Sequence, residues 1–184
     1  FGITEDAFKN YLKLVNKKLV DENFIIEINV AKESLSEWFV ERLDSLVRRY
    51  KDVPVNNILI DIDMIAFKDS DCISSLRKLQ DIGCKICIES VTFNFDQLIE
   101  IRRKLPYDMI KITTSHHKKP EFVKFLDFLV SNGVKIIVTK IEKADELQGL
   151  IKYDLNLVQG FLYGKPSEFN HFEERIWGND VFSV

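Results

Sequence analysis

The sequence predicts an α/β domain in which parallel strands alternate with helices that cover the sheet. Two observations predict this class. Short apolar runs typical of buried strands alternate with segments whose apolar residues recur at helical spacing. In addition, a polar or charged residue stands at or near the end of nearly every apolar run. In a (β/α)₈ barrel such strand ends meet around one mouth, where active sites are built.

In the first half of the chain, capping residues delimit the helices. Thr4 and Ser36 can accept hydrogen bonds from a helix N-terminus, the helix after Ser36 ends before Pro54, and Gly83 is a helix-ending residue. The predicted elements are, in order, a helix at 4–22, a strand at 24–30, the helix after Ser36, a strand at 57–63 and a helix at 70–82.

In the second half the same alternation continues. The pair Asn132-Gly133 ends one helix, and Pro106 precedes one strand. Six strands are visible, which fits an open doubly wound sheet or part of a (β/α)₈ barrel. The predicted elements are strands at 84–89, 108–113, 134–139 and at the start of 157–166, and helices at 95–104, 121–131, 143–153 and 167–177.

Composition narrows the class of protein. The 184 residues are 46% hydrophobic and 30% charged, which suits one ordinary core and a single domain over 1–184. The net charge of −3, with acids and bases interspersed, does not favour a nucleic-acid partner. No apolar run approaches the roughly 20 residues of a membrane helix, so no membrane segment is expected. The three cysteines suggest reduced thiols and a cytoplasmic protein.

The pair Cys84 and Cys87 forms a C-x-x-C sequence within a predicted strand. Residues three apart on a strand point to opposite faces of the sheet. The pattern therefore favours core packing over redox chemistry or a zinc site, which would need further ligands.

The segment LVQGFLYGKP at 157–166 contains apolar residues expected to be buried, interrupted by Gln159 and Gly160. A glycine in a strand lets a ligand or another backbone approach closely. The segment resembles the "vQGylfgrP" motif that closes the barrel of EAL domains, the bacterial cyclic di-GMP phosphodiesterase family. Further matches run from about residue 24 to 168: LIDID at 59–63 resembles "lEiTE", and LPYDMIKIT at 105–113 resembles "LP.D.iKID".

This resemblance implies a TIM-barrel-like, EAL-type parallel sheet with surrounding helices, six of eight strands visible, in an incomplete or truncated barrel. It also implies roles for single residues. The positions that correspond to the family's metal ligands are Asn29, Asp61 and Glu89. Lys111 matches the family's catalytic lysine, and Glu142 keeps a second acid. The positions left for contacts to the nucleotide are Gln159, Asp108, Lys111 and Pro166.

The chain also departs from the family pattern. Ser90, Thr113 and Thr139 stand where the family has acidic residues, Lys140 replaces a glycine, and the Glu-Ala-Leu signature with its arginine is absent. Cleavage by two metal ions needs carboxylates that bridge the ions. We therefore expect a degenerate site with no catalytic residues, no metal and no cofactor. Mg²⁺ or Mn²⁺ would be needed only for residual phosphodiesterase activity.

The expected function is that of a catalytically inactive regulatory module in bacterial signalling that acts by protein–protein interaction, with a protein partner or as a homodimer. The alternatives are a cyclic di-GMP receptor without hydrolysis, or a weakly active phosphodiesterase. An open sheet edge or the apolar tail with Phe172, Ile176, Trp177, Val181 and Phe182 could supply the interface, although the tail could equally pack on its own domain. The loop His116–Lys119 is interpreted as a solvated turn rather than a phosphate site.

Overall fold

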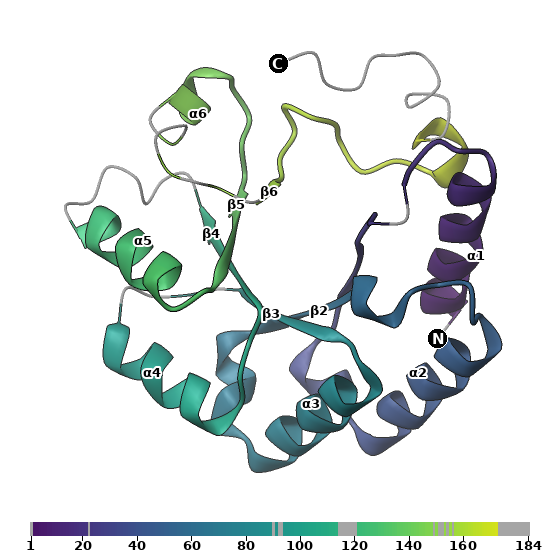
Figure 1. The fold of residues 1–184 in the computed structure, drawn as a ribbon, viewed down its shortest axis with the longest axis horizontal. Coiled ribbons are helices and arrows are strands. Elements are labelled where there is room, and N and C mark those ends of the chain that lie inside the picture. The colour runs from purple at the N-terminus through teal and green to yellow at the C-terminus, as the bar shows by residue number, and fades with distance from the viewer. Residues whose placement is uncertain are drawn as a thin grey trace.

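The computed structural model is an open half-barrel of six parallel strands with helices on its outer side (Figure 1). The residues that it describes are 2–21, 23–89, 91, 94–113, 121–148, 150, 153, 155 and 157–172. The strands are β1 (Ile26–Asn29), β2 (Ile58–Asp63), β3 (Lys85–Glu89), β4 (Met109–Thr113), β5 (Lys135–Thr139) and β6 (Leu157–Val158).

The strands lie in the sheet in their order along the chain, and each pairs in parallel with the next. A doubly wound sheet reverses its strand order at a switch point. This sheet has no such reversal among its six strands, so the barrel-type winding is confirmed and the doubly wound alternative is wrong.

Ser36 caps its helix as predicted, but the predicted cap Thr4 lies within the first helix, which begins at Gly2. Ser36, Asp69 and Asn94 each accept a hydrogen bond from a backbone N–H of the following turn, and Gly83 ends a helix with a φ of 113°. The helices are α1 (Gly2–Asn16), α2 (Glu37–Arg49), α3 (Ser70–Ile82), α4 (Phe95–Lys104), α5 (Glu121–Ser131) and α6 (Asp145–Gln148). Three short 3₁₀ helices join them: η1 (Lys32–Ser34), η2 (Val55–Asn57) and η3 (Met64–Lys68).

Two predicted helices have different bounds in the structure. The helix expected at 4–22 ends at Asn16, and Lys18 then takes a left-handed backbone conformation with a φ of 56°, which stops the helical path. Of the helix expected at 143–153, the described residues show a single turn, α6, and residues 149, 151 and 152 lie outside the described residues. At its start, the Glu146 carboxylate accepts hydrogen bonds from the backbone N–H groups of Glu142 and Lys143. Residues 169–172 of the helix expected at 167–177 are helical, and 173–177 lie outside the described residues.

The two faces of the sheet contribute to two separate sets of buried apolar residues. Side chains of one strand alternate between the faces. The outer-facing set joins strand isoleucines such as Ile60 and Ile110 to helix residues such as Leu76 and Phe125 in one large core. The inner-facing set is small, and we call it the apolar layer: Leu59, Cys87, Met109 and Ile137, with Ile25 packed against them.

The C-x-x-C pair divides between these two sets, as its spacing predicts. Cys84 belongs to the outer core and Cys87 to the apolar layer, and both are buried free thiols. Burial raises the pKa of the Cys84 thiol to about 12 and also raises the pKa of Cys87. Thiols that stay protonated are poor nucleophiles and poor metal ligands, so the structure supports the packing role.

The segment 157–166 differs from its predicted structure. Only Leu157 and Val158 form a strand, and the apolar side chains expected to be buried are exposed: Leu157 and Leu162 by 38%, Val158 by 39% and Phe161 by 55%. The expectation of a buried strand was wrong, because β6 is an edge strand that pairs only with β5 among the described residues. The expectation for Gly160 is confirmed: a Cβ there would lie 2.0 Å from the backbone oxygen of Ile141.

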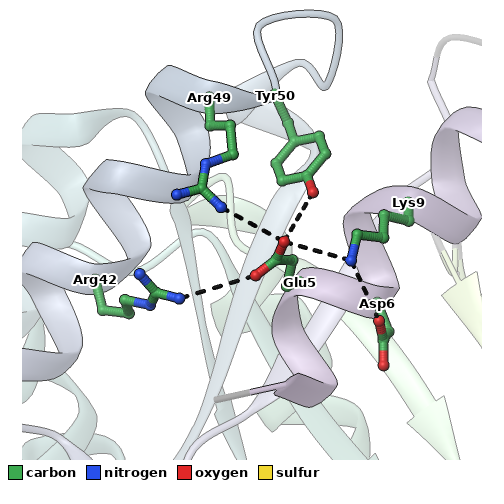
Figure 2. A network of polar contacts seen from close by, with 6 residues as sticks. All are labelled: Glu5, Asp6, Lys9, Arg42, Arg49 and Tyr50. Atoms are coloured by element: carbon green, nitrogen blue, oxygen red, sulfur yellow. Dashed lines mark hydrogen bonds and ion pairs between the residues drawn. The ribbon is translucent and has the colours of Figure 1, made fainter.

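Helix α1 is fastened to α2 by both apolar and polar contacts. The rings of Phe8 and Tyr50 pack edge to face with centroids 5.9 Å apart. Beside them, the Glu5 carboxylate accepts a hydrogen bond from the Tyr50 hydroxyl at 3.0 Å (Figure 2). Arg42, Arg49 and Lys9 surround the same carboxylate at 3.4 to 3.8 Å. These contacts hold α1 beside the open side of the half-barrel.

None of the helices within the described residues combines the length and the apolar character that a bilayer span requires.

Candidate functional site

A layer of polar side chains lies next to the apolar layer inside the half-barrel. Each apolar residue is followed, two positions later and on the same face of its strand, by a residue with a polar side chain. We call this set the polar layer: Glu27, Asp61, Glu89, Lys111 and Thr139. It lies toward the carboxyl ends of the strands, where α/β barrels place their sites. Its carboxylates outnumber its single ammonium group.

Three members of the polar layer form a buried ion triad. The Lys111 Nζ donates hydrogen bonds to Oδ2 of Asp61 at 2.6 Å and to Oε1 of Glu27 at 2.8 Å. Asp61 is 1% exposed and Lys111 8% exposed. The triad joins β1, β2 and β4, so the lysine side chain spans β3. The residue of β3 beside Asp61 is Cys87, whose small side chain leaves room for this reach.

The environment shifts the proton affinities of the triad. Burial alone would lower the pKa of Lys111, but the hydrogen bonds from its ammonium to Asp61 and Glu27 outweigh burial, so its pKa is raised. Burial raises the pKa of Asp61, and the hydrogen bond from Lys111 opposes that rise. The Asp61 Oδ1 is buried without a hydrogen-bond partner. Lys111 is therefore a charged and immobilised group at neutral pH.

The other two residues at the family's metal positions flank the triad. Asn29 pairs in register with Asp61 and is exposed. Glu89 pairs with Asp63, two residues further along β2 and β3 than the pair Asp61 and Cys87, and it is partly exposed. Burial, followed by repulsion from the Asp61 carboxylate, raises the pKa of Glu89. The Asp63 carboxylate already has a partner, because it accepts a hydrogen bond from the Ile65 backbone N–H at 2.8 Å and so caps η3.

The predicted nucleotide-binding positions lie at both ends of the strands. Asp108 lies at the amino end of β4, where its carboxylate accepts a hydrogen bond from the Ile86 backbone N–H at 2.9 Å. That is the end of the strand opposite to the polar layer. Gln159 and Pro166 are exposed in the segment that follows β6, and the Gln159 backbone N–H donates to Val138 at 2.8 Å. Of the four positions, only Lys111 belongs to the polar layer.

The remaining sequence candidates lie at the rim or outside the described residues. Glu142 is exposed, and Lys140 is exposed with a φ of 62°. The Thr139 hydroxyl donates to the Ile112 carbonyl at 3.2 Å and so links β5 to β4. Ser90 and the loop 116–119 lie outside the described residues.

Sequence reasoning missed Glu27. The signal was present, because in FIIEINV the glutamate alternates with isoleucines on both sides and shares a strand face with Asn29. A charged residue flanked in this way on a β-strand faces either solvent or a polar interior. The structure shows that Glu27 faces the interior, where it holds Lys111.

The triad bears on the divalent ions that the resemblance implies. A divalent cation needs oxygen ligands at about 2.0–2.6 Å, and the oxygens nearest the centre of this layer already accept hydrogen bonds from an ammonium. Within the described ranges, no three His, Cys, Asp or Glu side chains gather closely enough to hold a metal ion. The donor set as it stands does not fit a divalent cation.

Comparison with known proteins places the fold and the sequence in one family. The family model described as the EAL domain matches residues 3–166. The cyclic di-GMP phosphodiesterase PdeA of Borreliella burgdorferi is 23% identical over 177 residues, a match that covers 89% of this chain and 25% of PdeA. The chain thus spans a quarter of the length of that relative.

Two solved structures have the same fold. The EAL enzyme Bd1971, in a form with cAMP and cyclic di-GMP bound, superposes with a TM-score of 0.76 at 21% identity, covering 94% of this chain and 48% of that one. The EAL domain of Mycobacterium smegmatis DcpA gives a TM-score of 0.77 at 18% identity, covering 95% of this chain and 81% of that one. The half-barrel, its strand order and the match over residues 3–166 have one common explanation: the chain belongs to the EAL domain family.

Proposed function

We propose that this chain is a catalytically inactive EAL module that acts by contacting another protein chain. The observation that carries the proposal is the ion triad. Lys111, which matches the family's catalytic lysine, donates to two carboxylates that lie on its own sheet. An ammonium engaged in this way has two of its three donors directed at the protein rather than at a phosphate or a water molecule.

Two further features support inactivity. Thr139 stands at the position of a family acid, and its hydroxyl is used to link two strands. The polar layer holds three carboxylates beside one ammonium, whereas cyclic di-GMP carries two phosphate charges. Unpaired negative charge at the strand ends opposes the approach of such a dianion.

The contact with another chain is supported by the segment after β5. Four apolar side chains of 157–162 are exposed, and β6 has a neighbour on one side only among the described residues. An edge strand next to exposed apolar side chains is suited to pairing with another chain. The first occupant to test is a second copy of this chain.

The alternative is a cyclic di-GMP receptor without hydrolysis, or a weakly active phosphodiesterase. It is favoured by Gln159, which matches the closing motif of the family and is exposed near the carboxyl end of β5. The solved form of Bd1971 with cyclic di-GMP bound makes the same ligand the first to test here.

One set of measurements separates these functions. Incubation of the chain with cyclic di-GMP and Mg²⁺ or Mn²⁺, followed by chromatography, should yield no linear dinucleotide. Metal-dependent product that is lost in Lys111→Ala would overturn the inactive assignment. Calorimetry with the nucleotide should give no binding in the micromolar range, and binding that is lost in Gln159→Ala would favour the receptor.

Light scattering tests whether two copies of the chain associate through β6. The wild-type chain should form a dimer, and Phe161→Asp should shift it to a monomer because a carboxylate would be buried in the interface. Val130→Asp is the matched control, because Val130 is equally exposed at 55% but lies on α5. A wild-type chain that stays monomeric at high concentration would count against self-association through β6.

A further inference from the structure

We propose that Lys111 supplies the positive charge of the polar layer from within the chain, in place of a divalent cation, and that Glu27 is the residue that positions it. The inference goes beyond the proposed function, since it concerns what fills the site rather than which partner the domain contacts. It rests on the geometry of the triad and on the chemistry of its oxygens.

The carboxylates of the polar layer need a positive charge to balance them. Glu27, Asp61 and Glu89 place three carboxylates in one layer, and Asp61 is almost completely buried. Carboxylates that share a buried site require a cation or a proton to offset their repulsion. Lys111 provides that cation through two hydrogen bonds of 2.6 and 2.8 Å, in the range of charge-assisted bonds.

The Lys111 ammonium excludes a divalent cation from the space between Asp61 and Glu27. A metal ion bound to Oδ2 of Asp61 and Oε1 of Glu27 would lie within about 2.0–2.6 Å of both oxygens. The Lys111 Nζ already lies within 2.8 Å of both oxygens, so the two cations would share nearly the same space. Binding of the metal therefore requires displacement of the ammonium from a position where only 8% of the residue is exposed.

Without the Lys111 ammonium, the polar layer would present a set of oxygen ligands. Glu27 and Asp61 would keep two carboxylates on adjacent strands, and the buried Asp61 Oδ1 has no hydrogen-bond partner. Asn29 stands in register with Asp61 and carries an amide oxygen. Carboxylate and amide oxygens are the ligands that Mg²⁺ and Mn²⁺ prefer. A variant without the ammonium should therefore bind a divalent cation that the wild-type chain rejects.

Glu27 has a distinct part in this arrangement. Asp61 alone could pair with the lysine, but Glu27 adds the second acceptor and fixes the side chain across β3. Without this carboxylate the ammonium should gain mobility and exposure. In the wild-type chain Glu27 is therefore a positioning residue, and its carboxylate becomes available to a metal ion only when the ammonium is removed.

The test compares the melting temperature of the whole chain in EDTA and in increasing MnCl₂. The wild-type chain should melt at the same temperature throughout. Lys111→Met should melt at a lower temperature in EDTA and rise by several degrees with Mn²⁺, because a ligand that binds only the folded state stabilises it. Adding Glu27→Gln to Lys111→Met should abolish the rise. Lys135→Met, which removes the exposed lysine at the start of β5, is the matched control and should behave as wild type.

A wild-type chain that gains as much stability from Mn²⁺ as Lys111→Met does would overturn the proposal, as would a folded Lys111→Met that does not respond to Mn²⁺. Wild-type protein that binds Mn²⁺ but forms no linear dinucleotide would overturn this inference and leave the proposed inactivity standing.

If Lys111→Met does not fold, the wild-type chain still provides a test. Acylation of lysines followed by mass spectrometry should modify Lys111 far more slowly than the exposed Lys135, because Lys111 is 8% exposed and two carboxylates hold its ammonium. Glu27→Gln should accelerate the modification of Lys111, and Mn²⁺ should leave it unchanged in the wild type. Acceleration by Mn²⁺ in the wild type would mean that the metal displaces the ammonium, and the proposal would fail.

Discussion

The two faces of the sheet differ in how they are stabilised. The outer face buries isoleucines of every strand from β1 to β5 against helices, in one continuous apolar core. The inner face buries four apolar side chains in a thin layer and carries the ion triad directly beside it. Both faces belong to the same strands, because alternate residues point to opposite sides.

This difference separates what holds the domain together from what gives it chemistry. Apolar packing is non-directional and tolerates substitutions that conserve volume. The triad depends on the reach of one lysine across β3 and on two carboxylates with defined positions. The outer face should therefore dominate the free energy of unfolding, and the inner face should determine which ions and ligands can approach.

The largest effect is expected on the outer face. Phe125 on α5 is fully buried and packs edge to face on Phe95, with ring centroids 5.8 Å apart. Phe125→Ala should lower the free energy of unfolding by about 3–5 kcal/mol, through lost burial and the cavity left behind. Urea denaturation measures it. Val123→Ala on the same helix is the control, because Val123 is 43% exposed. Equal losses in the two variants would mean that α5 does not carry the core.

A smaller loss in the free energy of unfolding is expected from a substitution on the inner face. Asp61→Ala removes the buried acceptor and leaves Lys111 with Glu27 as its partner. Removing one member of a buried ion pair costs about 3–5 kcal/mol, and the retained Glu27 contact should keep the loss near about 3 kcal/mol. The double variant Asp61→Leu with Lys111→Met should lose less than Asp61→Ala alone, since the charge left without its partner is that of Glu27, whose side chain is 24% exposed. A larger loss in the double variant would mean that the triad contributes net stability.

The sequence predicted most of the fold because local signals and tertiary structure agree. The helices at 70–82, 95–104 and 121–131 have the predicted bounds, since capping residues such as Asn94 and a left-handed Gly83 define their ends. The strands are recognisable because alternate residues are buried in two different cores. The exposure of β6 was not predictable from its composition, because a short apolar run such as Leu157-Val158 looks the same in a central and in an edge strand.

The site was predictable only in part. The resemblance to EAL motifs identified Lys111 and Asp61 as site residues, but not that they bond to each other. Their contact requires the strand order and the reach of a lysine over a cysteine, which are properties of the assembled sheet. Glu27 lay outside the matched motifs, so only its alternation with isoleucines could have indicated an inward position.

The smallest effect on stability is expected from the polar contacts of Glu5 between α1 and α2 (Figure 2). The hydrogen bond from Tyr50, and next the hydrogen bond from Lys9, lower the pKa of Glu5 below its ordinary range. A carboxyl whose pKa is lower in the folded state stabilises the fold above its unfolded pKa, about 4.3. That contribution is lost as the pH falls through the folded pKa. The difference in urea midpoint between wild type and Glu5→Gln should therefore be largest near neutral pH and shrink below about pH 4.3. Tyr50→Phe removes the strongest of these contacts and should show part of the same pH dependence. A difference that stays constant from pH 7 to pH 3 would mean that packing of Phe8 on Tyr50, and not the charge of Glu5, fastens α1 to the outer face.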